Sequence, residues 1–269
     1  MRFRWLAVFP LIYAALFSAV AAWLGSDPHA LQSFMTDQRI VVRILSAVGC
    51  CLAVSVFARG DHLRRAWLCL GWAAVLILLR DVLRLFPPFQ AGGSGGMEAQ
   101  AFLSGLGILS NVALLAGIWE LARSWKMAAI ELPGGRAGVF AVAAVTAVLA
   151  LVVAGPGALE HGRAVVAGDW GSLIFFVSAV ADILSLCLIT PLLLTAVSLR
   201  GGLFFWPWAL VTASQVCWLL YDAAGTLAPH IAPRGFPLAE VFRGMAESYL
   251  FVAGVVQFLL IRHVRRAAG

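Results

Sequence analysis

Long runs of apolar residues, separated by short polar segments, make up most of the chain. A helix that crosses a membrane needs about 20 consecutive, mostly apolar residues. Stretches of this kind occupy residues 4–24, 39–58, 66–86, 100–122, 137–155, 171–198, 204–227 and 238–261. The connections between them are too short to hold a folded soluble domain. The pattern therefore predicts an all-α integral membrane protein with eight transmembrane helices.

Two segments within this pattern resemble each other. Residues 59–88 (RGDHLRRAWLCLGWAAVLILLRDVLRLFPP) align without gaps with residues 200–229 (RGGLFFWPWALVTASQVCWLLYDAAGTLAP). The alignment pairs residues that are scarce in so apolar a chain: Arg59 with Arg200, Gly60 with Gly201, Trp67 with Trp208, Asp81 with Asp222, and Pro88 with Pro229. Matches of leucine or valine would arise easily by composition alone, whereas these matches indicate a duplication.

The flanking helices extend the similarity. RILS (43–46) aligns with DILS (182–185), and SNVALLAGI (110–118) aligns with ESYLFVAGV (247–255). We therefore predict two tandem four-helix repeats, residues 1–130 and 137–269, joined by the cytoplasmic segment 131–136. An even number of helices gives both repeats the same orientation, so a pseudo-two-fold axis along the membrane normal should relate them.

Composition and charge add the location of the protein. The 269 residues are 62% hydrophobic and only 12% charged, whereas soluble domains are nearer half apolar and a quarter charged. Basic residues gather at both termini and on alternate connections, which are the cytoplasmic sides of membrane proteins. We expect a multi-pass protein of the cytoplasmic (inner) membrane, in contact with the lipid bilayer, with both termini in the cytoplasm. The net charge of +6 then follows from topology and gives no support for a nucleic-acid partner.

The first apolar run also resembles a signal peptide, with basic residues before it and Ala-Val-Ala-Ala at 19–22. It is long enough to span a membrane, and the first repeat would lack a helix without it. We therefore expect it to be retained as the first transmembrane helix.

Polar residues inside the predicted spans are the candidates for function. Such residues are rare, usually face the interior of the bundle, and are functional candidates by default. The candidate residues are Arg43, Arg80, Asp81, Asp182, Tyr221, Asp222, Arg243 and Glu247. With a rise of about 1.5 Å per residue, Asp182 and Glu247 lie near the middle of the membrane and the others lie toward its outer face. The inner half holds little charge apart from Glu120.

Two interpretations of this one-sided cluster remain open. The spacing of Glu240, Arg243 and Glu247 places all three on one helix stripe, so the cluster could be an ion-paired network that holds the two repeats together. Alternatively, it could line an outward-facing cavity for a small polar or ionic ligand. Proton or cation coupling through Asp182 and Glu247 is a narrower form of the second interpretation.

Catalytic and metal chemistry have little support in the sequence. No HExxH motif occurs, and His29, His161 and His230, which we expect in outer loops, lack a metal-ligand spacing. Two carboxylates at mid-depth do not by themselves establish acid–base catalysis. The five cysteines all fall within predicted helices without a CxxC spacing. We assign no catalytic residue, metal site or cofactor, and an intramembrane enzyme is the least supported class.

The second repeat resembles a known kind of membrane module. The segments ADILSLCLITPLLLTAVSLRGG and WPWALVTASQVCWLLYDAAGTL, followed by a helix ending VAGVVQ, are similar to multi-pass membrane input (sensor) regions of bacterial diguanylate cyclases and histidine kinases. The resemblance covers residues 171–257 best and, through the repeat, residues 40–122. We expect no output domain after Gly269, so the resemblance implies a sensor-like module that signals through a partner. Asp182, Tyr221 and Asp222 occupy the recurrent polar positions of this pattern.

These features together favour a non-enzymatic membrane protein, either a sensor-like module or an accessory subunit of a larger membrane complex. Its outer polar cluster would recognise a small polar ligand or a partner helix. The basic C-terminal segment 262–269 would contact anionic lipid or a cytoplasmic protein partner. The alternative is a small-solute or ion-coupled transporter or channel that uses the same cluster, since parallel repeats suit alternating access.

Overall fold

The computed structural model describes residues 4–90, 96–127, 135–200, 202, 204–231 and 236–268. In this part of the chain all regular structure is helical. The long helices are α1 (Arg4–Leu24), α2 (Pro28–Ser55), α3 (His62–Leu83), α4 (Gly96–Met127), α5 (Gly135–Val166), α6 (Leu173–Ser198), α7 (Phe205–Ile231) and α8 (Leu238–Ala268). Two short 3₁₀ helices, η1 (Pro87–Phe89) and η2 (Trp170–Ser172), lie in the α3–α4 and α5–α6 connections.

The predicted class of a helical, multi-pass membrane protein is confirmed. Seven of the described helices, α1 to α6 and α8, are long and apolar enough to cross a membrane. Helix α7 is also long, but Thr212, Ser214 and Gln215 interrupt its apolar sequence. All three of these side chains are buried inside the bundle. The crossing of the membrane by α7 therefore stays a prediction.

Several helices extend past the apolar runs that predict them. Helix α2 begins at Pro28, although the corresponding run begins only at residue 39. The Asp27 side chain accepts hydrogen bonds from the backbone amides of His29 and Ala30, which caps the helix, and proline suits its first position. His29 therefore lies in a helix, and the prediction that it lies in a loop is wrong.

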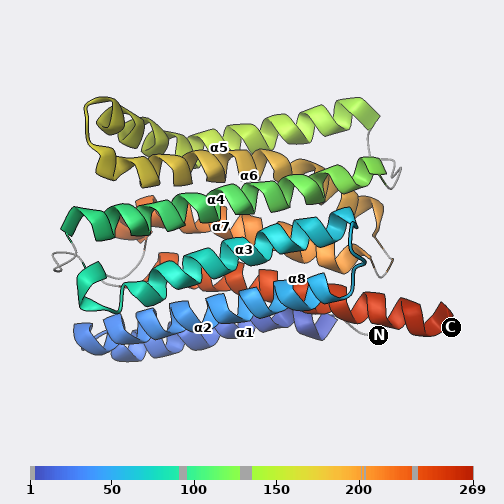
Figure 1. Ribbon diagram of the computed structural model, residues 1–269, viewed down its shortest axis with the longest axis horizontal. Coiled ribbons are helices and arrows are strands. Elements are labelled where there is room, and N and C mark those ends of the chain that lie inside the picture. Colours follow the sequence, from blue (N-terminus) through green and yellow to red (C-terminus); the bar gives the residue numbers. More distant parts are fainter. Residues whose placement is uncertain are drawn as a thin grey trace.

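The long helices run side by side along one direction (Figure 1). Both chain termini lie at one end of the bundle, which we call the terminal end (Figure 1). The short helices η1 and η2 lie at the other end, which we call the η end. The predicted topology identifies the terminal end with the cytoplasmic side of the membrane.

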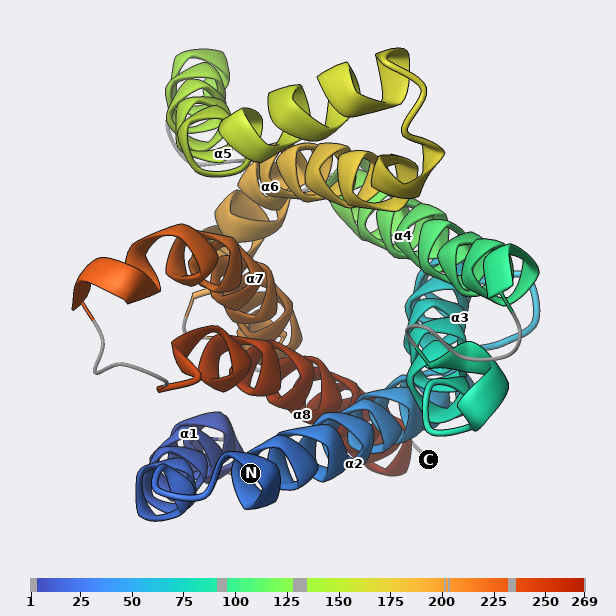
Figure 2. The same cartoon turned by 90° about the vertical axis from the view of Figure 1, so that its left-hand side faces the viewer.

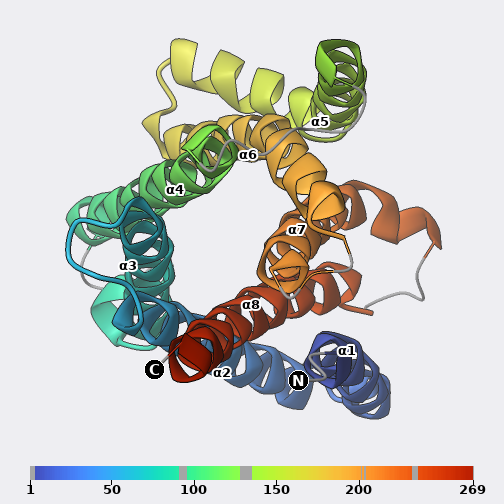
Figure 3. The ribbon, with the colours of Figure 1, turned by 90° about the vertical axis from the view of Figure 1, so that its right-hand side faces the viewer.

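Six helices form a ring when the bundle is viewed along its length (Figures 2 and 3). The order around the ring is α2, α3, α4, α6, α7 and α8, and each helix contacts its neighbours, including α8 with α2. Helices α1 and α5 lie outside the ring, α1 mainly against α8 and α5 mainly against α6. Three helices of each predicted repeat thus follow one another in the same order around the ring. The repeats and their axis stay predictions, and residues 131–134 of the predicted join lie outside the described residues.

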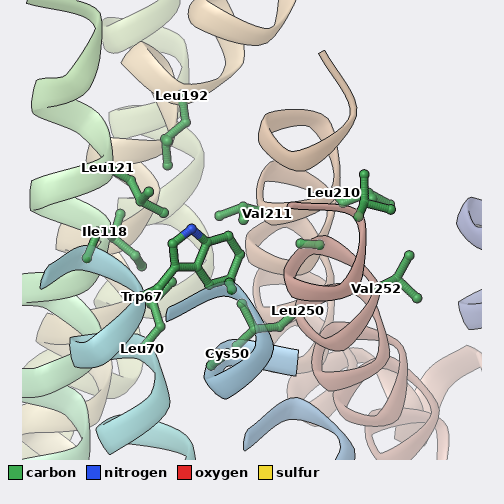
Figure 4. Packing of buried hydrophobic residues seen from close by; sticks show 14 of the residues in the cluster. Cys50, Trp67, Leu70, Ile118, Leu121, Leu192, Leu210, Val211, Leu250 and Val252 are labelled. Atoms are coloured by element: carbon green, nitrogen blue, oxygen red, sulfur yellow. The ribbon is translucent and has the colours of Figure 1, made fainter. Parts of the chain in front are cut away.

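The terminal half of the ring is filled by apolar side chains (Figure 4). The indole of Trp67, which is 1% exposed, packs in a cluster with buried residues from all six ring helices. Its members include Ile118 from α4, Leu192 from α6 and Val211 from α7. We call this group of residues the Trp67 cluster.

Helices α2 and α8 approach each other closely at two glycines. A Cβ atom on Gly49 would lie 2.6 Å from the backbone oxygen of Phe251, and one on Gly254 would collide with the backbone of Gly49. Small residues at such crossings let helix backbones come into direct contact. This contact closes the ring between the first and the last of its helices.

Candidate functional site

The η half of the ring encloses a cavity of about 570 Å³. This volume lies within the range of about 300–1,000 Å³ that is usual for small-molecule pockets. All eight predicted site residues line it: Arg43, Arg80, Asp81, Asp182, Tyr221, Asp222, Arg243 and Glu247. Leu70 and Leu250 line the cavity and also belong to the Trp67 cluster, so that cluster forms the floor of the cavity.

Arg43 of α2 is the most connected charge in the cavity wall. Its guanidinium Nη1 lies 2.5 Å from Oδ2 of Asp81 on α3 and donates a hydrogen bond to the backbone carbonyl of Ile77. Its Nε lies 3.9 Å from Oε1 of Glu247 on α8. All three charged side chains are almost fully buried. One arginine thus joins α2 to both of its neighbours in the ring.

A second group of charges lies nearer the η end. Glu240 of α8 accepts hydrogen bonds from Arg39 of α2, at 3.0 Å, and from Arg243 on its own helix. Arg243 also donates a hydrogen bond to the hydroxyl of Tyr221 on α7, with its guanidinium over the tyrosine ring. The sequence spacing leaves Arg243 a choice between Glu240 and Glu247, and the structure pairs it with Glu240.

Arg80 of α3 also lines the cavity, but no carboxylate lies within ion-pairing distance of it in the described part of the chain. Its Nε is buried and has no hydrogen-bond partner there. Gly107 of α4 makes room for Ile174 of α6, because a Cβ atom at that position would lie 2.6 Å from Ile174 Cδ1. Arg84, the residue that follows α3, lines the same wall as Arg80 and is exposed. Asp81, three residues before Arg84, pairs with Arg43.

Asp182 of α6 and Asp222 of α7 lie in the same cavity wall, close enough for their carboxyl groups to interact. Both side chains are half-buried. Two neighbouring carboxyl groups repel each other when both are ionised, so a shared proton or a bound cation would stabilise the pair.

Uncharged polar residues complete the wall. The side-chain amide of Asn111 on α4 donates a hydrogen bond to the Ser178 hydroxyl on α6 at 2.8 Å. Gln215 of α7 is buried and lines the cavity. The bond between Asn111 and Ser178 links α4 of the first predicted repeat to α6 of the second.

Two lining residues are absent from the candidates predicted by the sequence. Arg39 lines the cavity, but it stands at the first position of its apolar run, where a charge is ordinary. His161 lies in α5, not in a loop, and it stacks on Phe175 with ring centroids 5.2 Å apart. A polar residue at a helix end gives no signal in a hydropathy pattern, so neither residue could be distinguished from a solvated one.

Comparison with known proteins adds no further assignment, because no protein family, curated protein or solved structure matches the chain.

Proposed function

We propose that the protein is a sensor-like membrane module that binds a small ligand with an anionic group in the cavity of the η half. The observation that supports this most directly is Arg80, a cavity-lining arginine without an ion-pair partner among the described residues. A guanidinium recognises carboxylate, phosphate or sulfate groups by charge-assisted hydrogen bonds. In the predicted topology this cavity faces the outside of the cell.

The alternative of an inert ion-pair network accounts for only part of the cluster. Arg39, Arg43 and Arg243 each have a carboxylate partner, and two of these contacts join α2 to α8. These residues hold the ring together. Arg80 and Arg84 contribute nothing to that network, and a network packed for stability alone would leave no cavity beside them. We assign the paired arginines to structure and the unpaired ones to binding.

The closed floor favours a receptor over a transporter. A transporter that uses this cavity needs a path to the terminal end. The Trp67 cluster occupies that half of the ring with apolar side chains from all six ring helices. A cavity that opens at one end suits a protein that detects a ligand and reports its presence.

Helix α8 offers a route for that report. It carries Arg243 and Glu247 beside the cavity and continues as one helix to the terminal end (Figure 1). There, Arg262, Arg265 and Arg266 form a basic segment, of which Arg265 donates a hydrogen bond to the carbonyl of Val56 at the end of α2. We infer that this segment contacts anionic lipid or a cytoplasmic protein partner.

We further infer that the cavity arose from the duplication predicted by the sequence. Two aligned pairs of positions support this: Arg43 contacts Asp81 in the first repeat, and Asp182 contacts Asp222 in the second. The ring order supports it too, because α4 adjoins α6 and α8 adjoins α2. The outer helices differ, since α1 packs mainly on α8 of the other repeat and α5 mainly on α6 of its own.

A binding screen tests the proposed function. Purified protein in lipid nanodiscs is titrated with mono- and dicarboxylates, amino acids, phosphate, phosphate monoesters and sulfate, while the midpoint of thermal unfolding is followed. A ligand that binds only the folded state raises this midpoint, and the increase grows with the ratio of free ligand concentration to Kd. We expect at least one anion to do so, and Arg80→Gln to weaken its binding about tenfold or more.

The matched control is Arg65→Gln, which makes the same change on the same helix at the terminal end, where the side chain is exposed. It should leave binding unchanged. If every class of anion leaves the unfolding midpoint unaltered, or if both variants weaken binding equally, the cavity is not an anion site and the proposal is wrong.

A further inference from the structure

Asp182 and Asp222 differ from the other acidic residues of the cavity wall in their partners. Glu240, Glu247 and Asp81 each have an arginine partner. No arginine lies within ion-pairing distance of Asp182 or Asp222 in the part of the chain that the structure describes. Both carboxyl groups border the cavity, and Oδ2 of Asp222 is buried without a hydrogen-bond partner among the described residues.

The aligned pair in the first repeat shows which charge the second repeat lacks. Arg43 and Asp81 occupy the positions that align with Asp182 and Asp222, and they form an ion pair. In the second repeat an acid stands in place of the arginine. The substitution removes the protein's own cation and leaves two carboxyl groups beside the cavity, where a cation of the ligand could take its place.

We propose that the ligand is amphoteric, with a primary amine that binds between Asp182 and Asp222 and an acid group that binds Arg80. This inference rests on the proposed function and adds the chemical class of the ligand. The ammonium group replaces the proton that the two carboxyl groups share. One proton leaves to solvent as the ammonium enters, so the net charge of the carboxyl pair with its bound cation stays the same.

Other ionisable groups could also exchange protons when a ligand binds. The elements packed against α6 and α7 present His161 from α5 and Arg243 and Glu247 from α8, while α7 itself presents Tyr221. The variant His161→Gln is therefore a necessary control for any measurement of proton release.

The experiment uses matched series of small molecules on the protein in nanodiscs. The probes are amino acids with increasing separation between amine and carboxyl group, the alkanoates that lack the amine, and the alkylamines that lack the carboxyl group. Calorimetry gives the affinities, and a pH indicator in weakly buffered solution gives the protons released. Variants Asp222→Asn, Asp182→Asn and Arg80→Gln are compared with the unaltered protein.

We expect one length of amino acid to bind about tenfold or more tightly than its matched alkanoate and alkylamine. Its binding should release about one proton, in the unaltered protein and in His161→Gln alike. Asp222→Asn and Asp182→Asn should abolish both the preference for the amine and the proton release while retaining alkanoate binding. Arg80→Gln should weaken the binding of amino acids and of alkanoates alike.

Two results would overturn the inference. In the first, alkanoates bind as tightly as amino acids, and the aspartate variants change neither affinity. The ligand is then an acid without a cation, and the proposed function holds without this inference. If no amino acid binds while phosphate or sulfate does, the amphoteric class is wrong and the anion site remains. Absence of binding by every anion removes the proposed function as well.

Discussion

Arg43 and Asp81 form a buried ion pair that joins α2 to α3, with 2.5 Å between Nη1 and Oδ2. Glu247 of α8 lies on the other side of the same guanidinium, 3.9 Å from Nε. Two buried carboxylates from two neighbouring helices therefore depend on one cation. The three residues therefore contribute unequally to stability, because loss of the arginine leaves both acids unpaired.

The inequality gives a first prediction. Arg43→Met should destabilise the protein by about 3–5 kcal/mol or more, because removing one partner of a buried pair leaves uncompensated charge. Asp81→Asn should cost less, since Arg43 keeps Glu247 as a partner. The midpoint of thermal unfolding in detergent is measured, with size-exclusion chromatography used to monitor the loss of folded protein.

Arg123→Met serves as the control for this comparison. Arg123 pairs with Glu120 at a distance of 3.4 Å, but its side chain is 52% exposed, and exposed pairs contribute only about 0–1 kcal/mol. If Asp81→Asn destabilises the protein as much as Arg43→Met does, the shared-cation arrangement does not hold.

The glycine contact between α2 and α8 gives a second prediction. A methyl group on Gly254 would collide with the backbone of Gly49, so Gly254→Ala should separate the helices and destabilise the ring by about 1–3 kcal/mol. Gly105→Ala on α4 is the matched control, because its added Cβ meets nothing within 4 Å. Alanine is the better helix former by about 1 kcal/mol, so the control should be neutral or stabilising. Equal thermal stability of the two variants would argue against close contact at this crossing.

A third prediction concerns the direction in which the cavity opens. The experiment places single cysteines in a background where Cys50, Cys51, Cys69, Cys187 and Cys217 are replaced by alanine. Met97→Cys at the η end and Ala179→Cys in the cavity wall should react with a membrane-impermeant maleimide on intact cells. Leu192→Cys, in the Trp67 cluster, should react only after denaturation.

Each possible exception has its own meaning. If Met97→Cys is labelled only after the cells are opened, the orientation predicted from the basic residues is inverted. If Met97→Cys is labelled but Ala179→Cys is not, the cavity is closed to the outside. Labelling of Leu192→Cys in folded protein would indicate a path through the floor.

Sequence patterns alone predicted the helices and eight polar residues of the candidate site. Apolar runs are informative here because lipid requires long apolar helices, and rare charges inside such runs must face the interior. This reasoning selected eight residues that all line one cavity, although they come from five different helices. Pairing was harder to predict, since the partner of Arg43 within ion-pair distance on α3 lies 38 positions away in sequence.

The features that the sequence could not provide are those set by packing between helices. The placement of α1 and α5 outside the ring depends on which faces meet, and all faces of these helices are apolar. The void beside Arg80 depends on the ring geometry, which hydropathy does not describe. His161 lines the cavity because α5 extends beyond its apolar run.

The floor of the cavity gives the last prediction, which uses two tryptophans of the same helix. Trp67 is 1% exposed within its cluster, whereas the side chain of Trp72, five residues along α3, is 60% exposed on the outside of the bundle. Trp67→Ala should destabilise the protein by about 3–5 kcal/mol, since it leaves a large void in packed surroundings, and Trp72→Ala should change stability by about 0.5 kcal/mol or less. Thermal unfolding of the two variants in nanodiscs makes the comparison under identical conditions. A similar loss of stability in both variants would mean that Trp67 does not close the floor of the cavity. A path to the terminal end, which a transporter needs, would then be available.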